Sequence, residues 1–220
     1  MNLDADLLLS SHAATAEACG DLRHRAASRV QRAARRAPQT ALERLCHALD
    51  RAFAESAHAD EPSHQIGFVR SVRAALATAA ADATLLTRAQ REGAAECYRR
   101  HLLAADPLGR YAVAALVWMP GQASPVHAHH TWCGYAVIDG ALTETLYDWI
   151  AGDGHASEAR SHPRVPGAVS FVRAGRTGIH RLGNASNAPA VSLHLYGVSG
   201  AQLSTHVNDL VQVDNQRAAA

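Results

Sequence analysis

The residues of this sequence that are best suited to chemistry lie between two glycines, in the stretch GQASPVHAHHTWCGYAVIDG (121–140). His127 and His129 in this stretch are separated by one residue. Successive side chains of a β-strand point to opposite faces, so a strand would place both imidazoles on the same face. That geometry suits two ligands of one metal ion. Two histidines on an exposed strand face would give the same pattern, so the pair alone leaves both interpretations open.

The spacing around the two histidines favours the metal site. It matches the first signature of the cupin proteins, G(x)5HxH(x)3–4E(x)6G, from Gly121 to Gly140. The one difference is Cys133, which stands where the acidic ligand usually stands. The two glycines are expected in turns at the ends of the strand pair. A second cupin element, H(x)3N, corresponds to His180 and Asn184 in GIHRLGN.

The sequence therefore predicts a metal site formed by His127, His129 and His180. Three neutral imidazoles leave the ion its full positive charge, which favours anionic ligands such as a thiolate. Sulfur is a soft ligand and suits Fe(II) better than magnesium or calcium. Three protein ligands also leave coordination positions open, as a catalytic metal requires.

The elements that must position these residues change in character near residue 110. Before it, the chain is rich in Ala, Arg, Leu and Glu and poor in β-branched residues, which favours helices. The predicted helices are 40–56, 67–82 and 89–106. After it come short apolar or alternating segments separated by Gly, Pro, Asp and Asn, which indicate strands. The predicted strands are 110–120, 132–139, 141–149, 167–174 and 190–198.

This order of elements predicts a mainly β fold with an N-terminal helical layer. Closely spaced short strands with Gly and Pro turns are typical of an antiparallel barrel or jelly roll, and the cupin motifs specify the double-stranded β-helix (jelly-roll barrel). We expect two parts: an N-terminal helical extension over 1–39 and a cupin domain over 40–220. Within the domain, helices should occupy about 40–105 and the barrel about 110–215. The basic amphipathic segment 22–37 is expected to be a solvated helix face, with RNA or lipid contact as the alternative.

Composition excludes several classes of protein. With 48% hydrophobic and 19% charged residues, the chain has a soluble globular composition, and its net charge of +1 argues against a dedicated nucleic-acid binder. No apolar run reaches bilayer-spanning length, and the first thirty residues lack the apolar core of a secretory signal. The four cysteines form no CxxC pair, so neither a disulfide scaffold nor a zinc knuckle is indicated. We expect a cytoplasmic protein without nucleic-acid or membrane partners.

Several separate motifs together resemble the cysteine dioxygenase type I family of thiol dioxygenases, which are cupins. YRRHLL (98–103) resembles the family's Tyr-x-Arg segment, and SPVHAHHTWC (124–133) resembles its ligand strand. GIHRLGN (178–184) resembles the segment that bears the third ligand. PAVSLHLYG (189–197) is nearly the family's own sequence. The resemblance covers roughly residues 40 to 200.

The resemblance implies a role for each candidate residue. The three histidines would hold Fe(II), and Arg100, with Tyr98 beside it, would bind the carboxylate of the substrate bidentately. A relay of three side chains would direct a tyrosine hydroxyl to that carboxylate or to the oxygen. The relay residues are Ser192, His194 and Tyr196.

The relay residues alternate along one predicted strand, so all three would point to the same face, towards the metal. An outward-facing polar stripe would show the same alternation. In that case the residues between them, Val191, Leu193 and Leu195, would face inward.

The function that the resemblance implies is oxidation of L-cysteine by O2 to cysteine sulfinate, with a small thiol and O2 as the only partners. Two alternatives stay open: a 3-mercaptopropionate dioxygenase of the same fold, and a non-enzymatic metal-binding cupin. Relatives that prefer 3-mercaptopropionate usually carry Gln at the position of Arg100, Gly at that of Cys133 and Arg at that of Thr205. HHTW and HLLAADPLGRY, however, are typical of that branch. The oligomeric state cannot be read from the sequence.

Cys133 has a further implied role. In animal members of the family, a cysteine at this position is bonded to the ring of the relay tyrosine as a thioether. Since this chain has both Cys133 and Tyr196, we expect the same crosslink to form oxidatively at the iron centre. The alternative is a free buried cysteine that only packs.

Overall fold

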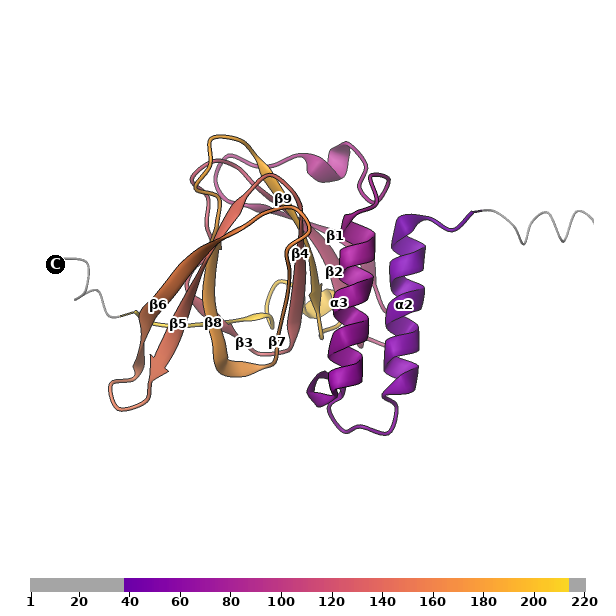
Figure 1. Ribbon diagram of the computed structural model, residues 1–220, viewed down its shortest axis with the longest axis horizontal. Coiled ribbons are helices and arrows are strands. Elements are labelled where there is room, and N and C mark those ends of the chain that lie inside the picture. The colour runs from indigo at the N-terminus through magenta and orange to yellow at the C-terminus, as the bar shows by residue number, and fades with distance from the viewer. Residues whose placement is uncertain (1–37, 214–220) are drawn as a thin grey trace, which may run out of the picture. The chain divides into compact units, whose positions relative to one another are not determined.

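The computed structural model describes residues 38–213, shown in colour in Figure 1. The described residues from Thr40 onward form one compact unit. The helical extension predicted for 1–39, with its basic segment at 22–37, lies outside the described residues except for Pro38 and Gln39.

Two of the predicted helices are present, as α2 (Ala41–Glu55) and α3 (Ile66–Ala80), and they lie side by side (Figure 1). Helix α2 begins at a capping box: Thr40 Oγ1 accepts from the backbone N–H of Glu43, and Glu43 Oε2 accepts from that of Thr40. Its apolar stripe is buried against the rest of the domain through Leu45 and Leu49. Nowhere in the described chain is there a helix with the length and apolarity needed to traverse a bilayer.

The helix predicted for 89–106 is wrong. The segment contains one short 3-10 helix, η2 (Ala89–Arg91), followed by strand β1 (Arg99–Ala105). Its Ala, Leu and Arg residues favour a helix in isolation. In the folded chain, however, β1 pairs along the edge of its neighbour β2, and this long-range pairing overrides the local preference. The helical region of the domain, predicted to reach about residue 105, therefore ends at η2. Two further 3-10 helices are η1 (Pro62–His64) and η3 (Gly200–Gln202).

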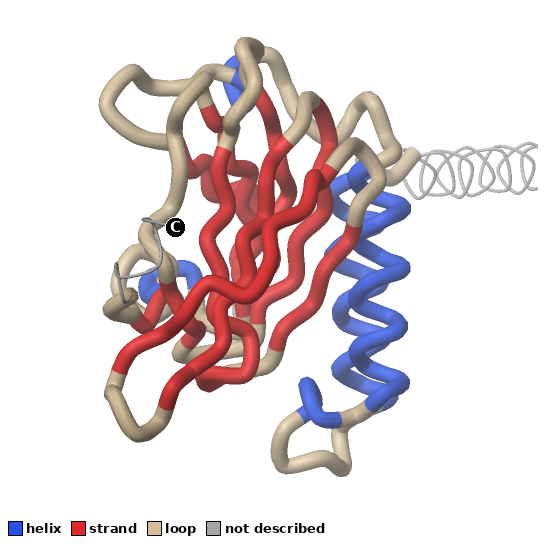
Figure 2. Tube along the Cα trace, turned by 60° about the vertical axis from the view of Figure 1, so that its left-hand side comes forward, coloured by secondary structure: helices blue, strands red, loops and turns tan. Residues whose placement is uncertain are grey.

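The strands form two antiparallel sheets, which appear in red in Figure 2. The first sheet has the order β1-β2-β9-β4-β7, with β2 (Ala112–Trp118), β9 (Ala190–Tyr196), β4 (Cys133–Asp139) and β7 (Val169–Val172). The second has the order β10-β3-β8-β5-β6, with β10 (Asn208–Leu210), β3 (His127–His129), β8 (Gly175–Gly183), β5 (Leu142–Ile150) and β6 (His155–Arg164). The predicted jelly-roll barrel with a helical layer is confirmed, and each strand predicted after residue 110 is present.

Strand β9 is buried along its whole length, because the first sheet is covered on both faces. Val191, Leu193 and Leu195 belong to the apolar cluster that also contains the inner faces of α2 and α3. Figure 1 shows the two helices on one side of β4 and β9, with β5, β6 and β8 on the other. Tyr196 belongs to a second cluster between the two sheets, which includes Leu182 of β8. The relay side chains therefore face the barrel interior and not the solvent.

Both glycines of the predicted motif lie in turns with positive φ, Gly121 at 82° and Gly140 at 69°. Only glycine adopts this region readily. At Gly140 a Cβ atom would also lie 2.6 Å from the carbonyl oxygen of Pro189. Glycine is thus favoured at both positions by the backbone conformation, and at Gly140 also by the close approach of the neighbouring chain.

A charged cluster joins the helical layer to the first sheet. Asp106, in the turn after β1, accepts from Arg110 Nε at 2.7 Å and from Arg110 Nη2 at 2.9 Å. Arg110 Nη2 also donates to Asp50 of α2. The hydrogen bonds from Arg110 lower the pKa of Asp106, although its burial opposes the shift.

Replacing Asp106 with asparagine should lower the free energy of unfolding by about 1–3 kcal/mol, because the half-buried guanidinium of Arg110 loses one of its two charged partners. A carboxylate whose pKa is lower in the folded state stabilises the fold at neutral pH, and this contribution disappears as the pH falls through the folded-state pKa. The free energies of unfolding of wild type and Asp106→Asn, measured with urea, should therefore differ at neutral pH and become equal in acid. Exposed Asp60→Asn is the control. A difference that is independent of pH would contradict this account.

Candidate metal centre

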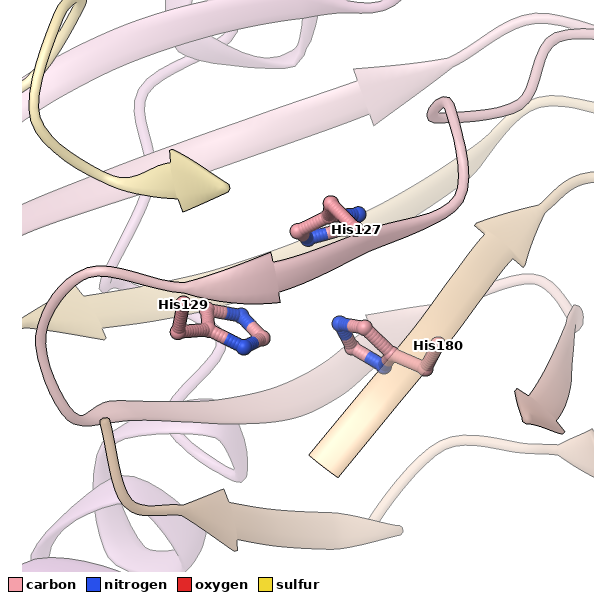
Figure 3. A group of neighbouring side chains, drawn as sticks. All are labelled: His127, His129 and His180. Atoms are coloured by element: carbon pink, nitrogen blue, oxygen red, sulfur yellow. The ribbon is translucent and has the colours of Figure 1, made fainter. Parts of the chain in front are cut away.

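The three predicted metal ligands lie together inside the barrel. His127 and His129 extend from β3, and His180 is the cross-strand partner of His127 on β8. One ring nitrogen of each histidine lies within 4.8 Å of those of the other two. Figure 3 shows the three rings gathered around a common space. All three are buried, with 6%, 2% and 7% of their surface exposed in chain order.

Two of the three rings are held in orientation by a hydrogen bond at Nδ1. His127 Nδ1 donates to the carbonyl oxygen of Pro125 at 2.9 Å, and His180 Nδ1 donates to Glu144 Oε1 at 2.8 Å. With a proton on Nδ1, each ring keeps the lone pair of Nε2 for a metal. His129 Nδ1 is buried without a hydrogen-bonding partner in residues 38–213.

Burial keeps the rings of His127 and His129 neutral. Burial first, and then the neighbouring His180, lower the pKa of His127 to about 4 and that of His129 to about 2. At neutral pH these two rings therefore offer uncharged nitrogen donors. A tripod of three imidazoles fits a divalent transition metal and leaves positions open for other ligands.

Glu144 was not identified from the sequence. It lies on β5, is 4% exposed, and contacts His180 through one carboxylate oxygen. The other, Oε2, lies 3.3 Å from His162 Nε2 and 3.5 Å from Arg164 Nε. Burial alone would raise the pKa of Glu144, but the hydrogen bond and charge of His180, with the charge of Arg164, lower it. The available signal was strand alternation, which places Glu144 on the inward face with Leu142.

The three relay residues form a hydrogen-bonded chain in the interior. Ser192 Oγ lies 2.8 Å from His194 Nε2, and His194 Nδ1 lies 3.1 Å from the hydroxyl of Tyr196. Trp118, which the sequence analysis did not identify, donates from Nε1 to Ser192 Oγ at 2.9 Å. Burial lowers the pKa of His194 well below its ordinary value, so its ring is neutral.

One proton arrangement pairs every donor of this chain except the hydroxyl of Tyr196. Trp118 Nε1 can only donate, so the Ser192 hydroxyl accepts from it and donates to His194 Nε2. His194 Nδ1–H then donates to the oxygen of Tyr196, whose own hydrogen is left to point into the cavity.

Arg100 reaches the same cavity from β1. Its Nη1 donates to the carbonyl oxygen of Leu203 at 2.9 Å, whereas its Nε is buried without a hydrogen-bonding partner among the described residues. The guanidinium lies 5.8 Å from the centre of the Tyr196 ring. Tyr98 stacks on Trp118 with ring centres 4.4 Å apart. A buried, unpaired Nε indicates a place for an anionic ligand.

Cys133 does not join the metal cluster. It is the cross-strand partner of Tyr196, on adjacent strands β4 and β9, and both side chains are buried. Burial raises the pKa of the Cys133 thiol strongly, so the thiol is protonated at neutral pH. Its side chain instead lies beside the relay tyrosine.

The structure brings nearly all predicted site residues into one cavity. Only Ser192 is set back, behind His194. The cavity is lined by Tyr98, Arg100, Leu116, Trp118, Ser124, His127, His129, Cys133, His180, Leu182, His194, Tyr196 and Asn208. Of the other histidines, His130 is exposed, whereas His162 contacts Glu144.

Comparison with known proteins gives a consistent result. The family described as Cysteine dioxygenase type I matches residues 64–206. Cysteine dioxygenase type 1 of Rattus norvegicus is 32% identical over 90 residues, and that of Danio rerio is 32% identical over 94 residues. Each match covers 40% of this chain and 45% of the relative, so the chain aligns with less than half of the length of these proteins.

Two solved structures are also similar. One is a protein of Thermus thermophilus, 20% identical, with a TM-score of 0.41 and coverage of 51% of this chain and 96% of that one. The other is a cupin superfamily protein of Desulfitobacterium hafniense, 16% identical, with a TM-score of 0.38 and coverage of 49% and 84%.

Alanine at His129 or His180 should reduce the bound divalent metal from about one ion per chain to a small fraction, since two imidazoles hold an ion much more weakly than three. Elemental analysis of purified protein measures this content. His58→Ala, in an exposed loop, should leave it unchanged. Full metal content in His180→Ala would remove that residue from the ligand set.

Proposed function

The chain belongs to the cysteine dioxygenase type I family of the cupin superfamily, and on this premise we propose that it is a thiol dioxygenase with a three-histidine Fe(II) centre. The proposed reaction joins L-cysteine and O2 so that both oxygen atoms end on sulfur, as cysteine sulfinate. One observation carries the proposal: the histidine cluster shares its cavity with the half-buried Arg100, whose buried Nε has no hydrogen-bonding partner among the described residues.

The proposed ligands are His127, His129 and His180, whose imidazole nitrogens suit the ion. Bound there, Fe(II) would supply the redox chemistry that brings a thiol and O2 to react. The protein holds the rings in place through the Pro125 carbonyl and the Glu144 carboxylate.

Arg100 is proposed to bind the substrate carboxylate. Its bond to the Leu203 carbonyl fixes the guanidinium, and its unpaired Nε remains to donate. A guanidinium binds a carboxylate through two parallel hydrogen bonds, which sets orientation as well as charge. Tyr98, stacked on Trp118, lies beside it on the cavity wall.

Tyr196 is proposed to direct its hydroxyl hydrogen to the substrate carboxylate or to the oxygen that reacts. The chain from Trp118 through Ser192 and His194 fixes the phenol so that this hydrogen is the one left unpaired. Such a donor is oriented before the substrate arrives and requires no rearrangement during the reaction.

A 3-mercaptopropionate dioxygenase is the second candidate, favoured by the segments HHTW and HLLAADPLGRY. That substrate lacks the amine of cysteine but keeps the thiol and the carboxylate. Arg100 and Cys133 favour cysteine. A non-enzymatic cupin is less well supported, because it would have no use for Arg100 or for the relay.

We further propose that the enzyme works in the reducing cytoplasm. The described cysteines Cys46, Cys97 and Cys133 are all free thiols. A reducing compartment keeps both these groups and a thiol substrate unoxidised.

Wild-type protein should oxidise cysteine with a higher kcat/KM than 3-mercaptopropionate. Arg100→Gln should reduce kcat/KM for cysteine by a factor that corresponds to roughly 2–5 kcal/mol, the cost of losing a desolvated charge-assisted pair. Sulfinate formation and O2 uptake with each thiol measure both. The matched control is Arg99→Gln, the exposed neighbour on the same strand. Faster oxidation of 3-mercaptopropionate would assign the enzyme to the second candidate.

The Cys133–Tyr196 crosslink also belongs to this proposal. Directly opposed residues on antiparallel strands place their side chains close together, and both side chains here face the same cavity. Forming the thioether joins sulfur to a ring carbon and removes one hydrogen from each, with O2 accepting the two electrons and two protons. The bond would hold the phenol in place, so it should raise activity without being essential.

After aerobic turnover, peptide mass spectrometry should find the Cys133 and Tyr196 peptides joined and lighter by the two hydrogens lost. Cys133→Ala should give only separate peptides, and the peptide bearing exposed Cys97 should stay unlinked. If the wild-type peptides remain separate after extensive turnover, Cys133 is a packing residue.

A further inference from the structure

A carboxylate lies directly behind the third metal ligand, although the ligand set itself contains none. Glu144 Oε1 accepts from His180 Nδ1 at 2.8 Å. The other two ligands differ: His127 Nδ1 donates to the neutral carbonyl of Pro125, and His129 Nδ1 has no hydrogen-bonding partner among the described residues. Within residues 38–213, His180 is thus the one ligand of the three whose ring is hydrogen-bonded to an anion.

We propose that Glu144 is a positioning residue of the metal centre, which supplies through His180 the negative charge that Cys133 removes from the ligand set. The inference rests on the metal site of the proposed function and not on its substrate. The sequence indicated an ion that keeps its full positive charge. The structure instead places a compensating charge one imidazole away.

Three neighbouring strands build this arrangement. Glu144 on β5 is opposite Leu182 on β8, two residues along from His180, so the carboxylate reaches the ring diagonally. On its other side, β5 pairs with β6, where Glu144 is opposite His162 and Leu142 is opposite Arg164. The carboxylate is therefore held between the ligand and the two basic side chains of β6.

The fold alone gives little reason for this cluster. Glu144 is almost fully buried, and Arg164 is partly buried with its guanidinium 5.3 Å from the centre of the Tyr135 ring. Buried ion pairs contribute little to stability, because desolvation of the charges offsets their attraction, and apolar residues of similar size serve as well. An acid at this position is explained by what it does to His180.

Two effects on the metal follow from the hydrogen bond. An anionic acceptor at Nδ1 fixes the ring orientation and tautomer and makes Nε2 a stronger donor, so the metal binds more tightly. The negative charge also reduces the attraction of the centre for a further anion. A loss of fold stability could imitate the first effect but not the second.

The test uses the full chain stripped of metal and reconstituted with Co(II), with azide as the anionic probe. The variants are Glu144→Ala and Glu144→Gln, with exposed Glu158→Gln on β6 as the matched control. Absorption titrations give the Kd for Co(II), and then the Kd for azide at the Co(II)-loaded site. Thermal unfolding of the metal-free proteins checks that each variant folds.

Glu144→Ala should weaken Co(II) binding roughly 10–100-fold. Glu144→Gln keeps an acceptor for His180 Nδ1 and should restore much of this affinity. Having lost the charge, it should bind azide more tightly, on the order of tenfold for two charges in a partly buried site. Glu158→Gln should match wild type in both titrations.

Equal azide affinity in Glu144→Gln and wild type, including no binding to either, would overturn the proposal, as would unchanged Co(II) affinity in Glu144→Ala. If Glu144→Ala does not fold, the azide comparison with Glu144→Gln decides alone. Neither titration depends on turnover. A protein that oxidises neither thiol would refute the proposed function and leave this result standing.

Discussion

Two-sided burial of strand β9 is the constraint on which the rest of the structure depends. The outward side chains Val191, Leu193 and Leu195 pack beneath the helices and contribute the apolar contacts that anchor the strand. Full burial of each such side chain is worth about 1.5–3 kcal/mol. Because the outer face holds the strand in place, the inner face can carry the polar side chains of Ser192 and His194.

A polar interior is stable only when its groups are paired, and in this barrel some of the buried polar groups are paired whereas others are not. Trp118, Ser192 and His194 satisfy one another, and Glu144 satisfies His180. The groups left over include Arg100 Nε, on the wall of the cavity. The unpaired Nε therefore indicates the kind of ligand that the cavity would bind, which is an anion beside the cluster of imidazoles.

Much of this arrangement was accessible from the sequence, because its signals are local. Strand alternation placed His127 with His129, and Ser192 with Tyr196, and the glycine spacing marked the turns around them. The misplaced helix at 89–106 had no such signal, since its composition favours one structure and its pairing with β2 imposes another. Glu144 and Trp118 were missed because a lone Glu or Trp in a strand shows nothing of its partner, which lies on a different strand and is set by the sheet register.

The short strand β3, which carries two of the three proposed metal ligands, has consequences for when the centre can form. One edge of β3 pairs with β8, and the other pairs with β10, where Asn208 is opposite His129 and Leu210 is opposite His127. Arg100 likewise depends on a late part of the chain, the carbonyl of Leu203. During synthesis the ribosome must therefore deliver Leu203 to Leu210 before β3 has both neighbours and Arg100 has its anchor. The metal can therefore bind only late, after the chain has been translated and the barrel has closed.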